Sequence, residues 1–219
     1  RDWSSDVCSS DLHAIQVGHH VADTITSTLD KPHKLEFEKV ALRFALFGKK
    51  RYWMLAVASP DNMDGYLDIK GDETVRRDSC SLMVESGKQM QRILMYEKNP
   101  YDSILELINK YTEDMVRGDI DMDKLIVSKS LNSNSQKLPH VHVAAKITER
   151  IRAEQSNEEP PRSGDRVNFV ITKARSGDVK YFEQAEDPSY VRKHNIPIDM
   201  LYYMEKQFWN AIDRKSTRL

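Results

Sequence analysis

The sequence predicts an α+β fold, in which a part that contains a β-hairpin is followed by a mainly helical part. Up to about Gly71, apolar and polar residues often alternate with a period of two, and aromatic and branched side chains are frequent. Beyond Gly71 the apolar residues recur with the spacing of amphipathic helices. A dense group of turn residues at 59–65 separates two strand-like runs. The change of period near Gly71 is the expected boundary between the two parts.

The first part is expected to begin with an amphipathic helix at 13–29, which ends before a proline. A strand is predicted at 34–40, where apolar and charged residues alternate. The β-type sequence continues over 41–58 and is followed by the turn residues of 59–65 and a short strand at 66–69. Two such runs around a Pro/Asn/Gly turn predict a β-hairpin with a long loop.

The second part is expected to contain five helices and two short strands. Proline follows an N-capping residue at Asp187-Pro188, and Gly118 is placed to end a helix. Polar loops are expected at 128–137 and 155–164. The predicted helices are 82–94, 104–118, 141–151, 188–193 and 198–212, and the predicted strands are 125–127 and 166–171.

The two ends of the chain resemble translated sequencing adapter. Residues 6–12 can be encoded by GAC GTG TGC TCT TCC GAT CT, and residues 213–219 by GAT CGG AAG AGC ACA CGT CT. These strings are reverse complements apart from their end bases, which two unrelated protein ends would not share by chance. We therefore expect residues 1–12 and 213–219 to be foreign and leave them out of the interpretation, as one would a fusion scar. The expected native part is an internal fragment, 13–212.

The amino-acid composition limits the classes of protein to which the chain can belong. The 33 basic and 34 acidic residues nearly cancel, so any surface for nucleic acid must come from local clustering. No stretch has the apolar length of a membrane-spanning helix, and no membrane partner is expected. Without Cys8, only Cys80 remains, and a single cysteine forms no internal disulfide. Cys80 is expected to be a small core residue in a protein of a reducing compartment.

Clustered cations are the most informative local feature. Three consecutive basic residues precede Tyr52, and on a strand they would point alternately to both faces. A hairpin would bring them close to a second basic group that follows the turn at 59–65. Such a patch on a rigid β scaffold is typical of proteins that grip a phosphate backbone or enter the minor groove. The cationic residues are Lys49, Lys50, Arg51, Lys70, Arg76 and Arg77.

These residues belong to a series of motifs that resembles the end of the palm and the thumb of family B DNA polymerases, with most likeness to delta-like and large-virus members. Their order and spacing match over essentially all of 13–212. The motifs occupy 35–40 (Leu-Glu-Phe-Glu-Lys-Val), 49–52 (Lys-Lys-Arg-Tyr), 70–78, 126–131, 139–144, 164–167, 185–191 and 198–199.

The resemblance implies a palm portion at 13–75 and a thumb at 76–212. It implies a DNA-directed DNA polymerase acting in replication, with Mg²⁺, dNTP substrates and a primer–template duplex. The catalytic carboxylates of the family lie in motifs that this sequence does not contain, so the metal ions would be bound outside it. Glu38 matches an acidic position beside the metal site and is a weak candidate for a residue of the catalytic region. The parent protein would act in the nucleus, the cytoplasm or a viral replication site. The resemblance leaves open whether a sliding clamp or accessory subunits bind the parent protein. The residues that inherit DNA contacts by position are Lys49, Lys50, Arg51, Tyr52 and Lys70, with Arg76 and Arg77 near the primer backbone.

The sequence departs from the family pattern at a few positions. Trp53-Met54 stand where small residues are usual, Asp72 replaces an apolar residue, and Asn168 stands where proline is common. We therefore expect the hairpin to differ in detail from the family pattern.

Plainer interpretations compete with the functional ones. The basic run could be a solvated edge strand, where lysines deter aggregation. His140 and His142 lack a second pair at ligand spacing and are expected to be structural. The acidic run at 119–123 lacks the glycine and the terminal glutamate of a calcium loop. One alternative for the whole chain is a stand-alone duplex-binding module, which an Asp-Thr-Asp-Ser motif upstream of residue 13 would exclude. The other is a protein-interaction domain, which salt-dependent DNA binding would exclude.

Overall fold

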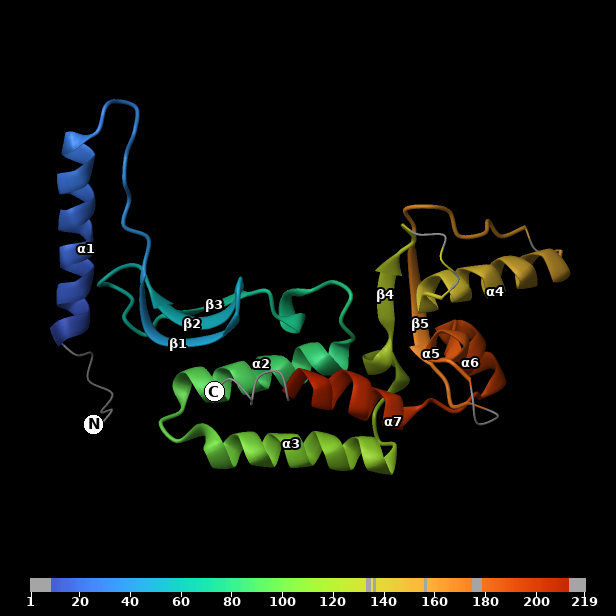
Figure 1. The fold of residues 1–219 in the computed structure, drawn as a ribbon. Coiled ribbons are helices and arrows are strands. Elements are labelled where there is room, and N and C mark those ends of the chain that lie inside the picture. The colour runs from blue at the N-terminus through green and yellow to red at the C-terminus, as the bar shows by residue number, and fades with distance from the viewer. Residues whose placement is uncertain (1–8, 133–134, 136, 156, 175–178, 213–219) are drawn as a thin grey trace.

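The computed structural model describes residues 9–132, 135, 137–155, 157–174 and 179–212. Residues 1–8 and 213–219, most of the two adapter-like ends, lie outside this range, as do 133, 134 and 136 of the expected loop at 128–137. The elements form an elongated arrangement, with helix α1 (Ser9–Thr28) at one end and a small sheet with its helices at the other (Figure 1). Within the described ranges, no helix has the length and apolar character to cross a membrane.

The first sheet is antiparallel and has the order β1-β2-β3, with β1 at Val40–Gly48, β2 at Arg51–Val57 and β3 at Tyr66–Lys70. The hairpin predicted around 59–65 is confirmed, since β2 and β3 pair across it. A second hairpin joins β1 to β2 inside the run that the sequence predicted as one β segment, 41–58. The apolar pattern is similar on both sides of the reversal, so periodicity alone did not reveal it.

The strand predicted at 34–40 is wrong, because pairing begins only at Val40. Residues 34–39 run alongside α1 instead (Figure 1). Leu35 exchanges hydrogen bonds of 3.0 and 3.1 Å with the Thr26 hydroxyl, and the Phe37 ring lies so close to Gly18 that a Cβ there would be 2.3 Å away. Helix side chains therefore take the place of a neighbouring strand.

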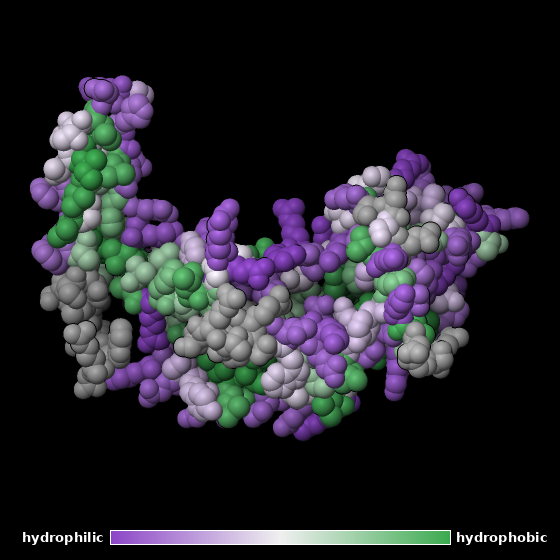
Figure 2. Space-filling view, viewed as in Figure 1, coloured by the Kyte–Doolittle hydropathy of each residue, from purple (hydrophilic) through white to green (hydrophobic). Residues whose placement is uncertain are grey.

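Helix α1 leaves much of its apolar side exposed. Apolar side chains cover one side of it in the space-filling view (Figure 2). Exposed fractions of 40–46% belong to Val17, Val21, Ile25 and Leu29. A surface of this kind is typical of a helix whose packing partner lies in another segment or chain.

A single apolar core connects the first sheet to the helices. Trp53 and Leu55 point from β2 into this core, which extends to Met115 and Phe208. Helix α2 (Ser81–Tyr96) lies under the sheet, and helix α3 (Pro100–Arg117) lies on the far side of α2 (Figure 1). The predicted stop at Gly118 is confirmed by its left-handed φ of 76°. Cys80 is buried, as expected of a small core residue.

The second sheet has the order β4-β5-β6, with β4 at Val127–Ser130, β5 at Arg166–Ile171 and β6 at Ala185–Glu186. The strand predicted at 125–127 is therefore displaced, because Leu125 ends a 3₁₀ turn, η2 (Met122–Leu125), and is fully buried. The remaining helical elements are η1 (Glu73–Val75), α4 (Pro139–Ala153), α5 (Tyr181–Gln184), α6 (Pro188–His194), α7 (Met200–Tyr202) and the π-helical turn η3 (Tyr203–Trp209).

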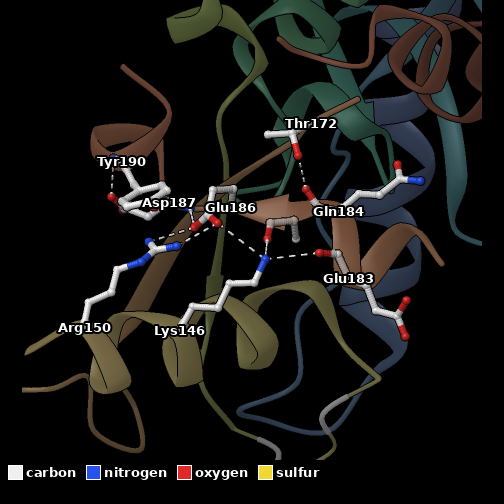
Figure 3. A network of polar contacts seen from close by, with 9 residues as sticks. Lys146, Arg150, Thr172, Glu183, Gln184, Glu186, Asp187 and Tyr190 are labelled. Atoms are coloured by element: carbon white, nitrogen blue, oxygen red, sulfur yellow. Dashed lines mark hydrogen bonds and ion pairs between the residues drawn. The ribbon is translucent and has the colours of Figure 1, made fainter. Parts of the chain in front are cut away.

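A partly buried ion-pair network around the buried Glu186 fastens α4 to β6 (Figure 3). Arg150 grips Glu186 through two hydrogen bonds of 2.8 and 2.9 Å and lies over the Tyr190 ring, with its Cζ 3.4 Å from the ring centroid. Lys146 donates to the Ala185 carbonyl at 2.8 Å. Burial raises the pKa of Glu186, but the Arg150 hydrogen bonds and the positive charges outweigh it, so that the pKa lies below its usual value. The carboxylate thus stays ionised and holds α4 against β6 of the second sheet.

Candidate nucleic-acid interface

Lys49 and Lys50 form the two-residue turn between β1 and β2, and Arg51 is the first residue of β2. The expectation that the three cations alternate along one strand is therefore wrong. Lys50 has a left-handed φ of 61°, a backbone conformation found in tight turns. All three side chains are exposed, and in the described part of the chain none of them forms an ion pair. The turn therefore presents uncompensated positive charge at the end of a rigid hairpin.

Lys70 joins this cluster through the sheet, as predicted. Its Cα lies opposite that of Tyr52 in the β2–β3 register, and its Nζ is 3.4 Å from the Asp68 carboxylate. Gly71 lets the two turns approach each other, because a Cβ there would lie 2.3 Å from the Lys50 carbonyl oxygen. The two lysine-bearing segments are thus held in contact by a position that only glycine can fill.

Asp72 anchors the chain just beyond this contact. One carboxylate oxygen accepts from the Trp53 indole nitrogen at 3.1 Å, and the other accepts from the Thr74 backbone nitrogen and the Gln91 amide. Asp72 and Trp53 are both buried. The hairpin is therefore fixed to α2 by polar bonds as well as by apolar packing.

Arg76 and Arg77 belong to a different part of the surface from the one predicted. Their contacts lead toward the second sheet: Arg76 binds Asp78 through two hydrogen bonds of 2.9 Å, and Arg166 donates to the Arg77 carbonyl at 2.9 Å. They line a cleft of about 390 Å³, together with Asp78, Lys129, Ser130, Asn132, His140 and Arg166. Two cationic surfaces thus follow each other along the chain, one on the hairpin and one beside the second sheet.

Comparison with known proteins identifies the family. The family model described as DNA polymerase family B matches residues 7–218. The chain belongs to this family. Among curated relatives of this family B chain, the DNA polymerase delta catalytic subunit of Glycine max is 37% identical over 206 residues, and that of Plasmodium falciparum is 38% identical over 194. These alignments cover 92% and 88% of the chain but only 18% and 17% of the relatives. The family B chain therefore corresponds to a segment of its relatives.

A solved structure supports the fold of this family B segment. The family B DNA polymerase from the archaeon Pyrobaculum calidifontis matches it with a TM-score of 0.63 at 24% identity. The match covers 90% of the chain and 24% of the archaeal chain. The α+β arrangement is thus shared with a family B polymerase.

Glu38 and its acidic neighbours in this family B segment were compared with the needs of a metal site. Within the described ranges, no group of three or more His, Cys, Asp and Glu side chains is placed to hold a metal ion. Glu38 is 80% exposed and lies 2.8 Å from Lys39, which also binds the buried Asp68 at 2.6 Å. The hydrogen bond from Lys39 lowers the pKa of Asp68. Lys39 therefore offsets the negative charge of both Glu38 and Asp68.

Sequence reasoning missed three cleft residues of this family B segment. Lys129 was assigned to a polar loop, Arg166 was treated as the start of a strand, and His140 was expected to be a structural histidine. β4 and β5 pair with Ser130 opposite Arg166, which brings these positions together across 36 residues of sequence. A cation on each of two short strands, close in sequence to the helix start at 139 or to the loop before it, was the available signal.

Proposed function

We propose that the chain is the part of a template-dependent DNA polymerase that holds the primer–template duplex. Carboxylates elsewhere in the parent protein would bind Mg²⁺ and catalyse nucleotidyl transfer from dNTPs. The turn of Lys49 and Lys50, packed against Lys70 and Gly71, carries the proposal. Lys49, Lys50 and Arg51 form no ion pair in the described part of the chain, and a duplex backbone is a polyanion that would offset their mutual repulsion.

The division into palm (13–75) and thumb (76–212) is part of the proposal. It is supported by the two separate sheets, between which the chain passes through η1, α2, α3 and η2. The exposed apolar side of α1 fits a palm helix whose neighbours belong to the rest of the parent. A sliding clamp or accessory subunit would bind to the full-length parent protein.

Duplex binding measured against salt concentration tests the proposal. Fluorescence anisotropy with a labelled primer–template should show an affinity that falls steeply with salt, because bound phosphates release counterions. Lys50→Ala and Lys70→Ala should each weaken binding to unrelated sequences about equally and lower the salt slope by about one.

Lys110→Ala is the matched control, because Lys110 is an exposed lysine on α3, away from the first sheet. It should leave affinity and slope unchanged. Unchanged binding in both hairpin variants, or a loss equal to that of Lys110→Ala, would overturn the proposal.

A further inference from the structure

We propose that the carboxylate of Asp68 is a positioning residue for duplex binding, which holds the ammonium group of Lys70 in place before the duplex arrives. This inference rests on the proposed function, in which Lys70 grips the duplex, and adds a residue that acts on the duplex only through Lys70. The burial of the carboxylate, the sharing of its two oxygens between two lysines and the fixed backbone of Lys70 support this role.

Asp68 is buried although it is an acidic residue in an edge strand of the described sheet. Its side chain is only 9% exposed, in the middle of β3. A carboxylate in such a place needs a cation or hydrogen-bond donors to offset the loss of water. Lys39, whose own side chain is 17% exposed, donates to it at 2.6 Å. The carboxylate is therefore fixed by a contact in which Lys70 takes no part.

The two oxygens of Asp68 face different lysines. Oδ2 accepts from Lys39, whereas Oδ1 lies 3.4 Å from the Nζ of Lys70. Asp68 and Lys70 stand two residues apart on β3, so that both side chains point to the same face of the sheet. The Lys70 side chain is 58% exposed. Its ammonium group is thus held on one side by a fixed carboxylate and is open to a ligand on the other.

The backbone of Lys70 is already fixed by the fold. Its Cα pairs with that of Tyr52, and the next residue, Gly71, lies against the Lys50 carbonyl. The freedom that remains is in the four-carbon stem of Lys70, and ordering such a stem on binding lowers affinity. A carboxylate that restricts the stem in the free chain reduces this cost. Lys50 has no such neighbour in the described part of the chain.

The negative charge of Asp68 makes the direction of its effect informative. If the carboxylate acted on the duplex only by repelling it, Asp68→Asn would strengthen binding. Loss of a positioning carboxylate should instead weaken binding by about twofold to tenfold, the range expected for ordering one long side chain. Asp64→Asn is the matched control, because Asp64 is an exposed carboxylate in the loop before β3. It should bind the duplex as tightly as the wild type or more tightly.

A double-mutant cycle tests whether Asp68 acts through Lys70. Fluorescence anisotropy with a labelled primer–template compares the 219-residue chain with Asp68→Asn, Lys70→Ala and the double variant. Asp68→Asn should weaken binding when Lys70 is present and should not weaken it further in Lys70→Ala. A merely structural role would weaken binding by the same factor in both backgrounds. Asp68→Glu keeps the charge and should bind more tightly than Asp68→Asn.

Carbon-13 relaxation at the lysine Cε atoms measures the positioning in the unbound wild-type chain and needs no variant to fold. The Cε of Lys70 should have a higher order parameter than those of Lys49 and Lys50, because only Lys70 has a carboxylate beside it. A value for Lys70 no higher than theirs would overturn the inference.

The outcomes separate this inference from the proposed function. If neither Lys50→Ala nor Lys70→Ala weakens binding, the proposed function fails and the inference fails with it. If Lys70→Ala weakens binding, but Asp68→Asn weakens it equally in both backgrounds or strengthens it, only the inference is overturned. A loss that requires Lys70, together with an ordered Lys70 Cε, supports it.

Discussion

The indole nitrogen of Trp53 donates a buried hydrogen bond of 3.1 Å to the carboxylate of Asp72. The sequence departs from the family pattern at both positions, and the structure shows that the two departures are the two ends of one interaction. A large aromatic donor in β2 and a carboxylate after Gly71 compensate each other. Together they join the hairpin to the start of the helical part.

Trp53→Phe and Asp72→Ala should each lower the free energy of unfolding by about 2 kcal/mol, since each leaves a buried polar group without its partner. The double variant should lose about 1 kcal/mol less than the sum of the two, because the shared bond is lost only once. Urea denaturation of the four chains measures this coupling. Trp209→Phe, at a position 41% exposed, is the control. Strict additivity would show that the bond contributes nothing.

The predictable and unpredictable parts of the fold differ in the range of the interactions that set them. Helix ends were predictable where a local residue fixes them, as at Gly118 and Asp187. The turn at Lys49 and Lys50 was not, because an Asn-Gly signal is absent and the pattern of apolar residues continues through it. The segment around Leu35 has a strand pattern, but its partner is a helix.

The candidate site divides in the same way. Lys70 was correctly placed beside the basic turn, because hairpin pairing follows from the sequence of the turn at 59–65. The cleft of Arg77 and Arg166 depends on packing between the segment after η1 and β5, 89 residues apart. No local pattern encodes such a contact. Only the ordered series of motifs that resembles the family indicated that these residues act together.

Gly71→Ala should destabilise the chain far more than Gly118→Ala does. Both glycines have a positive φ, so each substitution carries a backbone cost of about 1 kcal/mol. At Gly71 the new Cβ would also lie 2.3 Å from the Lys50 carbonyl, whereas nothing lies within 4 Å at Gly118. Thermal unfolding compares the two, and duplex affinity should fall only for Gly71→Ala. Equal melting temperatures would contradict the close approach.

Lys50→Gly should separate stability from binding. Glycine adopts a positive φ without a steric cost, so the chain should gain up to about 1 kcal/mol of stability. Duplex affinity should fall as it does for Lys50→Ala, because the charge is lost in both. Denaturation and anisotropy on the same preparation measure the two effects, and a variant that is more stable and binds DNA equally well would remove Lys50 from the interface.

Acid should weaken the second sheet through Glu186. Its pKa is depressed in the folded chain, so its ion pairs stabilise the fold above the usual carboxyl pKa of about 4.3 and lose this effect as the pH falls through the lower folded value. Glu186→Gln should cost about 3 kcal/mol at neutral pH and flatten the decline of stability below about pH 5. Glu205→Gln, at an exposed position, should keep the wild-type profile. An unaltered slope in Glu186→Gln would assign the acid sensitivity to other groups.

The hydrogen bond from Arg166 to the Arg77 carbonyl joins the second sheet to the segment that follows η1, so that movements of the two are coupled. A tilt of β5 would drag the Arg77 carbonyl with it, and η1 would pass this displacement back toward the lysine-bearing hairpin. A displacement imposed on one part, such as that by the ligand of the proposed function, would therefore be transmitted to the other.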